Sequence, residues 1–377
     1  MSDLAMNNIF CRFFILDILI LLFLFMQTGC HTQTPPVTSS RLAPFTLRPV
    51  SYSALPNWNK DHVAETWPAF LRSCNKLIRY QKWHAVCVQA RNMQHPSDKA
   101  VRNFFETYFK PYQVKSGNHT EGLFTGYYEP EIHGSRTRST RFNTAIYKRP
   151  DDLIMIEDLG IFRPDLKGIR IAGRSVRGSL KPYYTHEQIN KGALSGNELI
   201  WIEDPVESFF IQVQGSASVK LDNGESIRLV YAGTNGHAYT AIGTVLVREH
   251  GVASRHISMQ SIRDWLKAHP AKSQEILQQN ASYVFFTEMK GEGPIGDHGV
   301  VLTPGRSLAV DTRYIPHGTP VWLDTNNVKR LVIAQDKGGA IKGPIRGDLF
   351  WGTGDKAGEL AGSMKAKGGY FILLPEK

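Results

Sequence analysis

Glycines and short apolar runs surround two acids in residues 331–352, LVIAQDKGGAIKGPIRGDLFWG. Asp336 follows the apolar run 331–334, and Asp348 directly precedes Leu-Phe-Trp-Gly. A third acid, Asp311, follows Leu-Ala-Val a short way upstream. Apolar neighbours raise the pKa of a carboxyl group because they disfavour its charged form, and a general acid needs that adjustment near neutral pH. Since an aspartate at a strand end is more often a turn or cap residue, the pattern only makes these acids candidates for catalysis.

Strand-like runs continue on both sides of this stretch. From residue 283 to the end, short apolar runs alternate with turn residues, and Tyr, Thr, Val and Gly are frequent after Gly117. Residues 209–214, FFIQVQ, are expected to form a strand, and Asn223-Gly224 is expected to turn one strand into the next. Regularly spaced short strands are typical of a barrel, so the predicted class is mainly β with N-terminal helices.

Helical patterns lie before and between the β-rich parts. Apolar residues recur at helical spacing in residues 61–93, and Ser97 is placed to cap a helix that runs to residue 109. Shorter helices are expected at three places: after Thr185 in a capping box with Gln188, around 239–249, and around 261–269.

The N-terminus has the features of an export signal. Arg12 precedes an apolar stretch that is too short to span a bilayer, which is typical of a secretory signal. The signal is expected to cover residues 1–29, and Cys30 resembles the acylated cysteine of bacterial lipoproteins; the alternative is an ordinary cleaved signal with an incidental cysteine. His31 replaces the aspartate that commonly retains lipoproteins in the inner membrane, so the expected location is the outer membrane, facing the periplasm. Residues 30–58, rich in Pro, Ser and Thr, are predicted to be a tether.

Two cysteines, Cys74 and Cys87, are left for the folded part of the chain. A disulfide is permitted in an exported, oxidising compartment. A buried free cysteine is also a common filler in helical sequence, so the residues alone leave both interpretations open.

The sequence lacks the motifs of several common enzyme classes. The sequence contains no HExxH, no pair of CxxC motifs and no GxSxG, and His298 and His317 look isolated, so neither a metal nor a cofactor is expected. The formal net charge of +10 comes from scattered Lys and Arg residues without a dense basic block, and nucleic acid is therefore not an expected partner. Flat aromatic side chains next to amides and hydroxyls, as in residues 124–129, hint instead at sugar binding.

Four motifs together resemble the membrane-bound lytic murein transglycosylase A family. In chain order they are TGYYEP (125–130), FIQVQGS (210–216), YAGTN (231–235) and AQDKGGAIKG (334–343). The resemblance implies a double-psi-like β-barrel main domain, a smaller inserted β-domain and a groove between them that holds a glycan. The main domain maps to residues 59–129 plus 279–377, and the insertion to 130–278.

The resemblance also implies a reaction and its residues. The family's module of three aspartates corresponds here to Asp311, Asp336 and Asp348, and Asp348 aligns with the catalytic acid. The implied enzyme is a peptidoglycan exotransglycosylase that cuts the β-1,4 bond between N-acetylmuramic acid and N-acetylglucosamine and leaves a 1,6-anhydro sugar. The residues themselves do not distinguish action at strand ends from action within strands.

The expected partners are glycan strands and an outer-membrane lipid anchor, with cell-wall synthesis or division proteins as candidate protein partners. Five residues in the family-like motifs are candidates for sugar contacts: Thr125, Tyr128, Gln214, Ser216 and Asn235.

Two other interpretations of the same residues remain. Asp336 and Asp348 could be the two carboxylates of an ordinary glycoside hydrolase that uses water. The chain could also be a peptidoglycan-binding lipoprotein without activity, although retention of all three aspartates argues against that.

Overall fold

The computed structural model describes residues 44–291 and 293–376. The predicted signal 1–29, Cys30 and the first part of the predicted tether lie outside the described residues. Within the described residues, no helix is both long enough and apolar enough to span a membrane.

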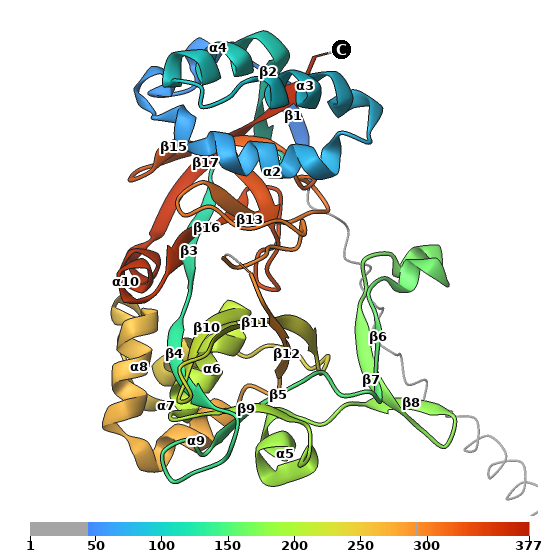
Figure 1. The fold of residues 1–377 in the computed structure, drawn as a ribbon, viewed down its shortest axis with the longest axis vertical. Coiled ribbons are helices and arrows are strands. Elements are labelled where there is room, and N and C mark those ends of the chain that lie inside the picture. The colour runs from blue at the N-terminus through green and yellow to red at the C-terminus, as the bar shows by residue number, and fades with distance from the viewer. Residues whose placement is uncertain (1–43, 292, 377) are drawn as a thin grey trace, which may run out of the picture. The chain divides into compact units, whose positions relative to one another are not determined.

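A closed barrel of six strands forms the main domain (Figure 1). The ring runs β3–β17–β14–β15–β13–β16 and returns to β3, and two further strands, β2 and then β1, extend the sheet beyond β17. Inward-facing apolar side chains such as Phe124, Leu308 and Leu349 fill its core. The strand bounds are β1 Thr46–Pro49, β2 Phe109–Lys115, β3 Gly122–Glu129, β13 Ser307–Val310, β14 Pro320–Thr325, β15 Lys329–Asp336, β16 Arg346–Thr353 and β17 Lys365–Pro375.

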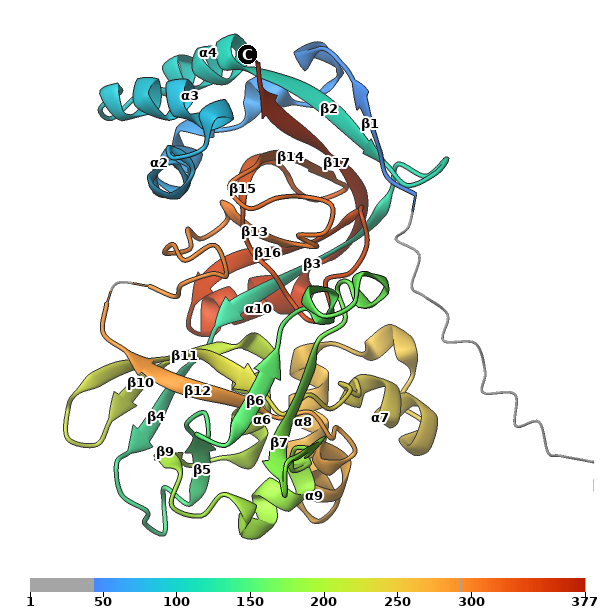
Figure 2. The ribbon, with the colours of Figure 1, turned by 90° about the vertical axis from the view of Figure 1, so that its right-hand side faces the viewer.

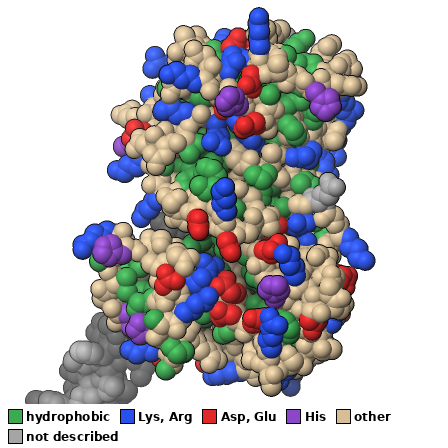
Figure 3. Space-filling model, turned by 60° about the vertical axis from the view of Figure 1, so that its left-hand side comes forward, with side chains coloured by type: hydrophobic (Ala, Val, Ile, Leu, Met, Phe, Trp, Pro, Cys, Tyr) green, Lys and Arg blue, Asp and Glu red, His purple; other side chains and the backbone are tan. Residues whose placement is uncertain are grey.

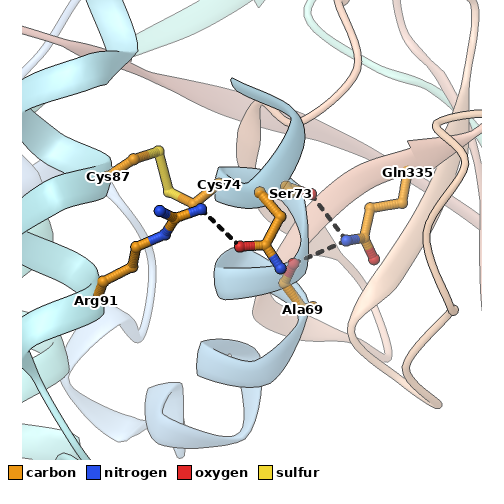
Figure 4. The surroundings of a disulfide bond; sticks show 7 residues. Ala69, Ser73, Cys74, Cys87, Arg91 and Gln335 are labelled. Atoms are coloured by element: carbon orange, nitrogen blue, oxygen red, sulfur yellow. Dashed lines mark hydrogen bonds between the residues drawn. A yellow bond between two sulfur atoms is a disulfide. The ribbon is translucent and has the colours of Figure 1, made fainter. Parts of the chain in front are cut away.

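Three helices cover one side of this barrel, α2 (Trp67–Leu77), α3 (Gln81–Asn92) and α4 (Asp98–Tyr108), as Figure 2 shows. Aromatic side chains of the helices pack against Trp322 and other residues of the barrel strands. Ser97 caps α4 as predicted, because its side chain accepts a hydrogen bond from the N–H of Ala100. A disulfide joins Cys74 of α2 to Cys87 of α3, which decides the question that the sequence left open (Figure 4).

The inserted part is built on a second sheet of six strands, in the order β12-β11-β10-β4-β9-β5, with a separate three-stranded sheet, β6-β7-β8. The predicted turn at Asn223-Gly224 joins β10 to β11, and the capping box of Thr185 and Gln188 is present. The bounds are β4 Glu131–Ser135, β5 Thr144–Tyr147, β6 Leu153–Ile156, β7 Ile171–Val176, β8 Ser179–Pro182, β9 Glu198–Ile202, β10 Ser216–Leu221, β11 Ser226–Thr234 and β12 Val284–Met289. The helices are α5 His186–Gln188, α6 Pro205–Gln214, α7 Ile242–His250, α8 Met259–Ala268 and α9 Pro270–Gln278, while α10 Asp355–Ser363 packs on the barrel.

The predicted strand at 209–214 is wrong, because these residues end helix α6. Asp204 caps its first turn, Pro205 occupies the first helical position, and Gly215 ends it in a left-handed conformation. Phe209 and Phe210 pack on the neighbouring helices, whereas Ile211 packs on the six-stranded sheet. A helix that is buried on two sides has a continuous apolar run, which resembles a buried strand.

Two predicted boundaries also differ from the structure. Strand β1 pairs with β2, and Trp58 is buried in the core, so the fold begins within the predicted tether. At the other edge, β12 pairs with β11 of the inserted sheet, so this sheet extends past the predicted end of the insertion at residue 278. The predicted fold class, a β-barrel main domain with a smaller inserted β-domain, is confirmed.

Candidate active site

A row of paired residues crosses four barrel strands and brings two of the three aspartates together. Ala309 of β13 is paired with Asp336 of β15 on one side and with Asp348 of β16 on the other. Asp348 is paired in turn with Thr125 of β3. Paired residues on neighbouring strands point to the same face, and strands lie about 4.8 Å apart. The two aspartate backbones are therefore about 10 Å apart, with only a methyl side chain between them.

Asp348 lies on the outer face of the barrel, because side chains alternate along a strand and its neighbour Leu349 points into the core. Thr125 Oγ1 donates a 2.6 Å hydrogen bond to Asp348 Oδ1, and Arg346 Nη2 donates a 2.8 Å bond to the same Thr125 oxygen. Burial raises the pKa of Asp348 to about 6; the Thr125 hydrogen bond and the Arg346 charge oppose this, and the charge of Asp336 adds to it. This carboxyl group can therefore carry a proton close to neutral pH.

Asp336 has a different set of partners. Its Oδ2 accepts a 2.8 Å hydrogen bond from the Tyr127 hydroxyl, and its Oδ1 accepts 2.9 Å bonds from the backbone N–H groups of Asp297 and Lys337. Burial raises the pKa of Asp336 above its usual value, and the three hydrogen-bond donors, which favour the charged form, offset only part of this rise. Asp336 thus accepts three hydrogen bonds, whereas Asp348 accepts one. This difference favours Asp336 as the anion and Asp348 as the proton carrier.

Asp311 is bound to other partners. Its carboxylate accepts hydrogen bonds from the Arg313 guanidinium, at 2.9 and 2.6 Å, and from the backbone N–H of Gly343 at 2.8 Å. Burial alone would raise its pKa, but these donors outweigh burial and hold the pKa below its usual range. This aspartate stays ionised and fastens the loop around Gly343.

The five candidate sugar contacts have unequal surroundings. Thr125 is bonded to Asp348, and Ser216, which begins β10, is partly exposed. Gln214 accepts a hydrogen bond from the backbone N–H of Tyr128, and the Tyr128 ring is buried. Asn235 is buried, and its side chain is bonded to four backbone groups. For Tyr128, Gln214 and Asn235 the geometry favours a structural role, whereas a sugar contact at Thr125 or Ser216 stays a prediction.

Sequence reasoning missed two neighbours of the aspartate pair. Tyr127 could have been found, because it lies two residues after Thr125 on the same strand and therefore on the same face. Asp297 lies in a turn, where no periodic pattern indicates a partner. The interpretation of His317 as isolated is also wrong, since its Nε2 lies 2.8 Å from Asp297 Oδ2, and the His298 ring lies 5.3 Å from the His317 ring.

Residues 44–291 and 293–376 contain no group of three or more His, Cys, Asp or Glu side chains placed to hold a metal ion. On the face drawn in Figure 3, Lys and Arg side chains are spread out and interleaved with Asp and Glu.

Two family models match the two parts of the chain. The MltA specific insert domain matches residues 123–287, and the 3D domain matches residues 306–374. A crystal structure of MltA from Neisseria gonorrhoeae is similar with a TM-score of 0.77 at 36% identity, over 88% of this chain and 93% of that one. This chain belongs to the MltA family.

Other members of the MltA family extend the comparison. Membrane-bound lytic murein transglycosylase A of Escherichia coli K12 is 33% identical over 270 residues, which are 68% of this chain and 66% of that protein. The match therefore spans just under two thirds of this relative's length. The crystal structure of E. coli MltA with bound chitohexaose is similar with a TM-score of 0.66 at 29% identity, over 89% of this chain and 95% of that one.

Proposed function

We propose that this protein is a lytic transglycosylase that cleaves the β-1,4 bond between N-acetylmuramic acid and N-acetylglucosamine in peptidoglycan. The observation that carries the proposal is that Asp336 and Asp348 have unequal surroundings. Burial raises the pKa of Asp348 to about 6, and the neighbouring Asp336 accepts three hydrogen bonds where Asp348 accepts one. Membership in the MltA family and the chitohexaose bound to a relative support a glycan substrate.

The proposed reaction has two steps, and Asp348 serves in both. The protonated carboxyl group first donates its proton to the glycosidic oxygen, so that the bond from this oxygen to C1 of the muramic acid breaks. The resulting carboxylate then takes the proton of the C6 hydroxyl group of the same sugar, and O6 bonds to C1. The product is a 1,6-anhydro ring, and Asp348 is protonated again. Since the attacking oxygen belongs to the substrate, a high effective concentration replaces the water of a hydrolase.

Asp336 has a separate role in this proposal. Positive charge develops on the sugar ring as the bond to the leaving group breaks. An ionised Asp336 next to the bond stabilises that charge, and its negative charge also keeps the proton on Asp348 before the reaction. The proposal extends to an exo-acting enzyme that is anchored in the outer membrane through an acylated Cys30 and faces the periplasm.

A two-aspartate hydrolase is the second candidate, because one observation favours it. Backbones about 10 Å apart can hold two carboxyl groups far enough apart to leave room for a water molecule, as in inverting glycosidases. The end of the product decides between the two reactions, since a hydrolase leaves a reducing sugar and a transglycosylase leaves an anhydro ring.

Mass spectrometry of peptidoglycan digested by the chain from residue 31 onward tests the proposal. We expect muropeptides one water lighter than hydrolysis products, and none with Asp348→Asn, which removes the transferable proton while keeping the side-chain size. Asp324→Asn is the matched control, because it removes a carboxylate paired with Lys329 at the far end of β15. Reducing ends would support the hydrolase, and a folded wild type that digests nothing would support a binding protein.

A further inference from the structure

The turn before β13 carries an acid that is not among the three aspartates. Asp297 lies in this turn, which is closed by hydrogen bonds between Gly296 and Val300 and between Gly299 and Gly296. Its backbone N–H donates the 2.9 Å hydrogen bond to Asp336 Oδ1. The N–H of Lys337 donates to the same oxygen, so two segments of the chain converge on one carboxylate atom.

The side chain of Asp297 is held from both sides. Lys337 Nζ lies 2.7 Å from Asp297 Oδ1, and His317 Nε2 lies 2.8 Å from Oδ2. Burial raises the pKa of Asp297, but these two partners outweigh burial and lower the pKa to about 2. Asp297 and Lys337 are thus connected twice: their side chains form an ion pair, and their backbone N–H groups both donate to Asp336 Oδ1.

The turn also approaches the end of β15 closely. The N–H of His298 donates to the Gln335 carbonyl at 3.1 Å. A Cβ atom at Gly296 would lie 2.4 Å from the Gln335 carbonyl oxygen and 3.2 Å from Asp336 Cβ, so only glycine permits this approach. On the other side, the N–H of Gly318, next to His317, donates to the Ala334 carbonyl at 2.7 Å. Both turns are therefore fastened to the strand that ends in Asp336.

We infer that Asp297 is a positioning residue for the glycan-cleaving reaction: its carboxylate, clamped by Lys337 and His317, keeps its own backbone N–H directed at Asp336. This inference rests on the proposed function. Asp297 acts through Asp336 and does not itself donate a proton to the substrate.

Asp297→Asn tests the inference, because positioning and charge have opposite effects on the ionisation of Asp336. The groups that face Asp336 are Tyr127 from β3, Lys337 and Asp297, with Asp348 across β13. Removal of the Asp297 charge alone lowers the pKa of Asp336, since that charge raises it now. A loosened N–H donor raises it. We therefore expect the acid limb of the kcat profile to move to higher pH, with kcat about tenfold lower and KM little changed.

Asp324→Asn is again the matched control, since β15 separates its partner Lys329 from Asp336 by about 23 Å. His317→Ala is the second variant, because it loosens the clamp without removing a negative charge, and it decides the matter if Asp297→Asn does not fold. The inference is overturned if the acid limb of the variant's kcat profile stays in place or moves to lower pH. It is also overturned if the kcat of the variant equals that of the Asp324→Asn control. Absence of anhydro products from the wild type would overturn the proposed function instead.

Discussion

Thr125 connects two charged groups of the candidate active site, Arg346 and Asp348, through one hydroxyl oxygen. It accepts a hydrogen bond from Arg346 and donates one to Asp348. A hydrogen bond to a carboxylate favours the charged form, so Thr125 holds the pKa of Asp348 lower than burial alone would set it. The hydroxyl group of Thr125 therefore lowers the pKa of Asp348, in addition to any contact that it makes with sugar.

Thr125→Val should raise the pKa of Asp348 further. In the wild type the protonated form is lost as pH rises through about 6, so the proposed reaction slows above that pH. Without the hydroxyl the alkaline limb of kcat is expected to move upward by about one pH unit, since one hydrogen bond to a charged group contributes about 1.5 kcal/mol. A pH–rate profile measured beside that of the wild type checks this. An unchanged or lowered limb would show that the bond does not control Asp348.

The family resemblance implied that Asp348 is the acid, and the structure adds the hydrogen bonds that distinguish Asp348 from Asp336. The apolar neighbours in the sequence predicted a raised pKa for all three acids. The pKa of Asp311 is instead lowered, because Arg313 and Gly343 donate hydrogen bonds to its carboxylate. The hydrogen bonds that separate Asp336 from Asp348 come from Tyr127, on a strand more than 200 residues earlier, and from a turn. Strand alternation places Tyr127 on the same face as Thr125, whereas no local pattern indicates that the turn at Asp297 contacts Asp336.

At the scale of elements, helix α2 supports the end of strand β15, which carries Asp336. Gln335 Nε2 donates 2.8 Å hydrogen bonds to the Ala69 carbonyl and to Ser73 Oγ, and Gln335 precedes Asp336 (Figure 4). The neighbour of Ser73 is Cys74, which is bonded to Cys87 of α3. The disulfide therefore holds the helix on which this part of β15 rests.

Replacement of both cysteines by alanine is expected to lower the free energy of unfolding by about 3 kcal/mol, the loss typical for a closed loop of this length. Urea unfolding of the oxidised wild type and the double variant measures the difference. Reductant should destabilise the wild type to a similar extent and leave the variant unchanged. Equal stability of the two oxidised proteins would contradict the expectation.

Helix α6 shows where element prediction fails. The Asp204-Pro205 start and the Gly215 end are ordinary helix signals, but residues 209–214 between them contact apolar groups on two sides. Burial on both sides removes the apolar–polar periodicity that distinguishes a helix from a strand. Only the residues at the two ends of the segment then indicate a helix.

At the scale of the whole molecule, the two places where the chain passes between barrel and insertion meet at one ion pair. Glu129, at the end of β3, is fully buried and accepts a 2.8 Å hydrogen bond from Arg228 of β11. Arg228 also donates to the Gly291 carbonyl, where the chain returns towards the barrel. Thr353 Oγ1 donates to the second oxygen of Glu129.

Arg228→Ala should destabilise the protein by about 3–5 kcal/mol, because it leaves a buried carboxylate without its cation. Adding Glu129→Gln should recover part of that loss, since the buried charge is then absent. Thermal or urea unfolding of the single and double variants measures both effects. A single variant as stable as the wild type would contradict the expectation, as would a double variant less stable than the single.

The domain edges were the least predictable feature at this scale. Strand β1 extends the sheet of the barrel because it pairs with β2, and β12 belongs to the inserted sheet because it pairs with β11. Each pairing joins segments that are far apart in the sequence, so composition around residues 58 and 278 does not mark it. The order of barrel, insertion and barrel was implied by the family resemblance.

The ring of six strands also constrains when this protein can become active during its biosynthesis. Strand β3 closes the ring by pairing with β16 and with β17, which both follow it by more than 200 residues. Thr125 and Asp348 are 223 residues apart, so these two side chains meet only after residue 348 has been synthesised. A nascent chain, or one truncated before residue 365, carries every candidate acid but has no closed ring to hold them. The architecture thus delays the proposed glycan cleavage until β17 has been synthesised and has paired with β3.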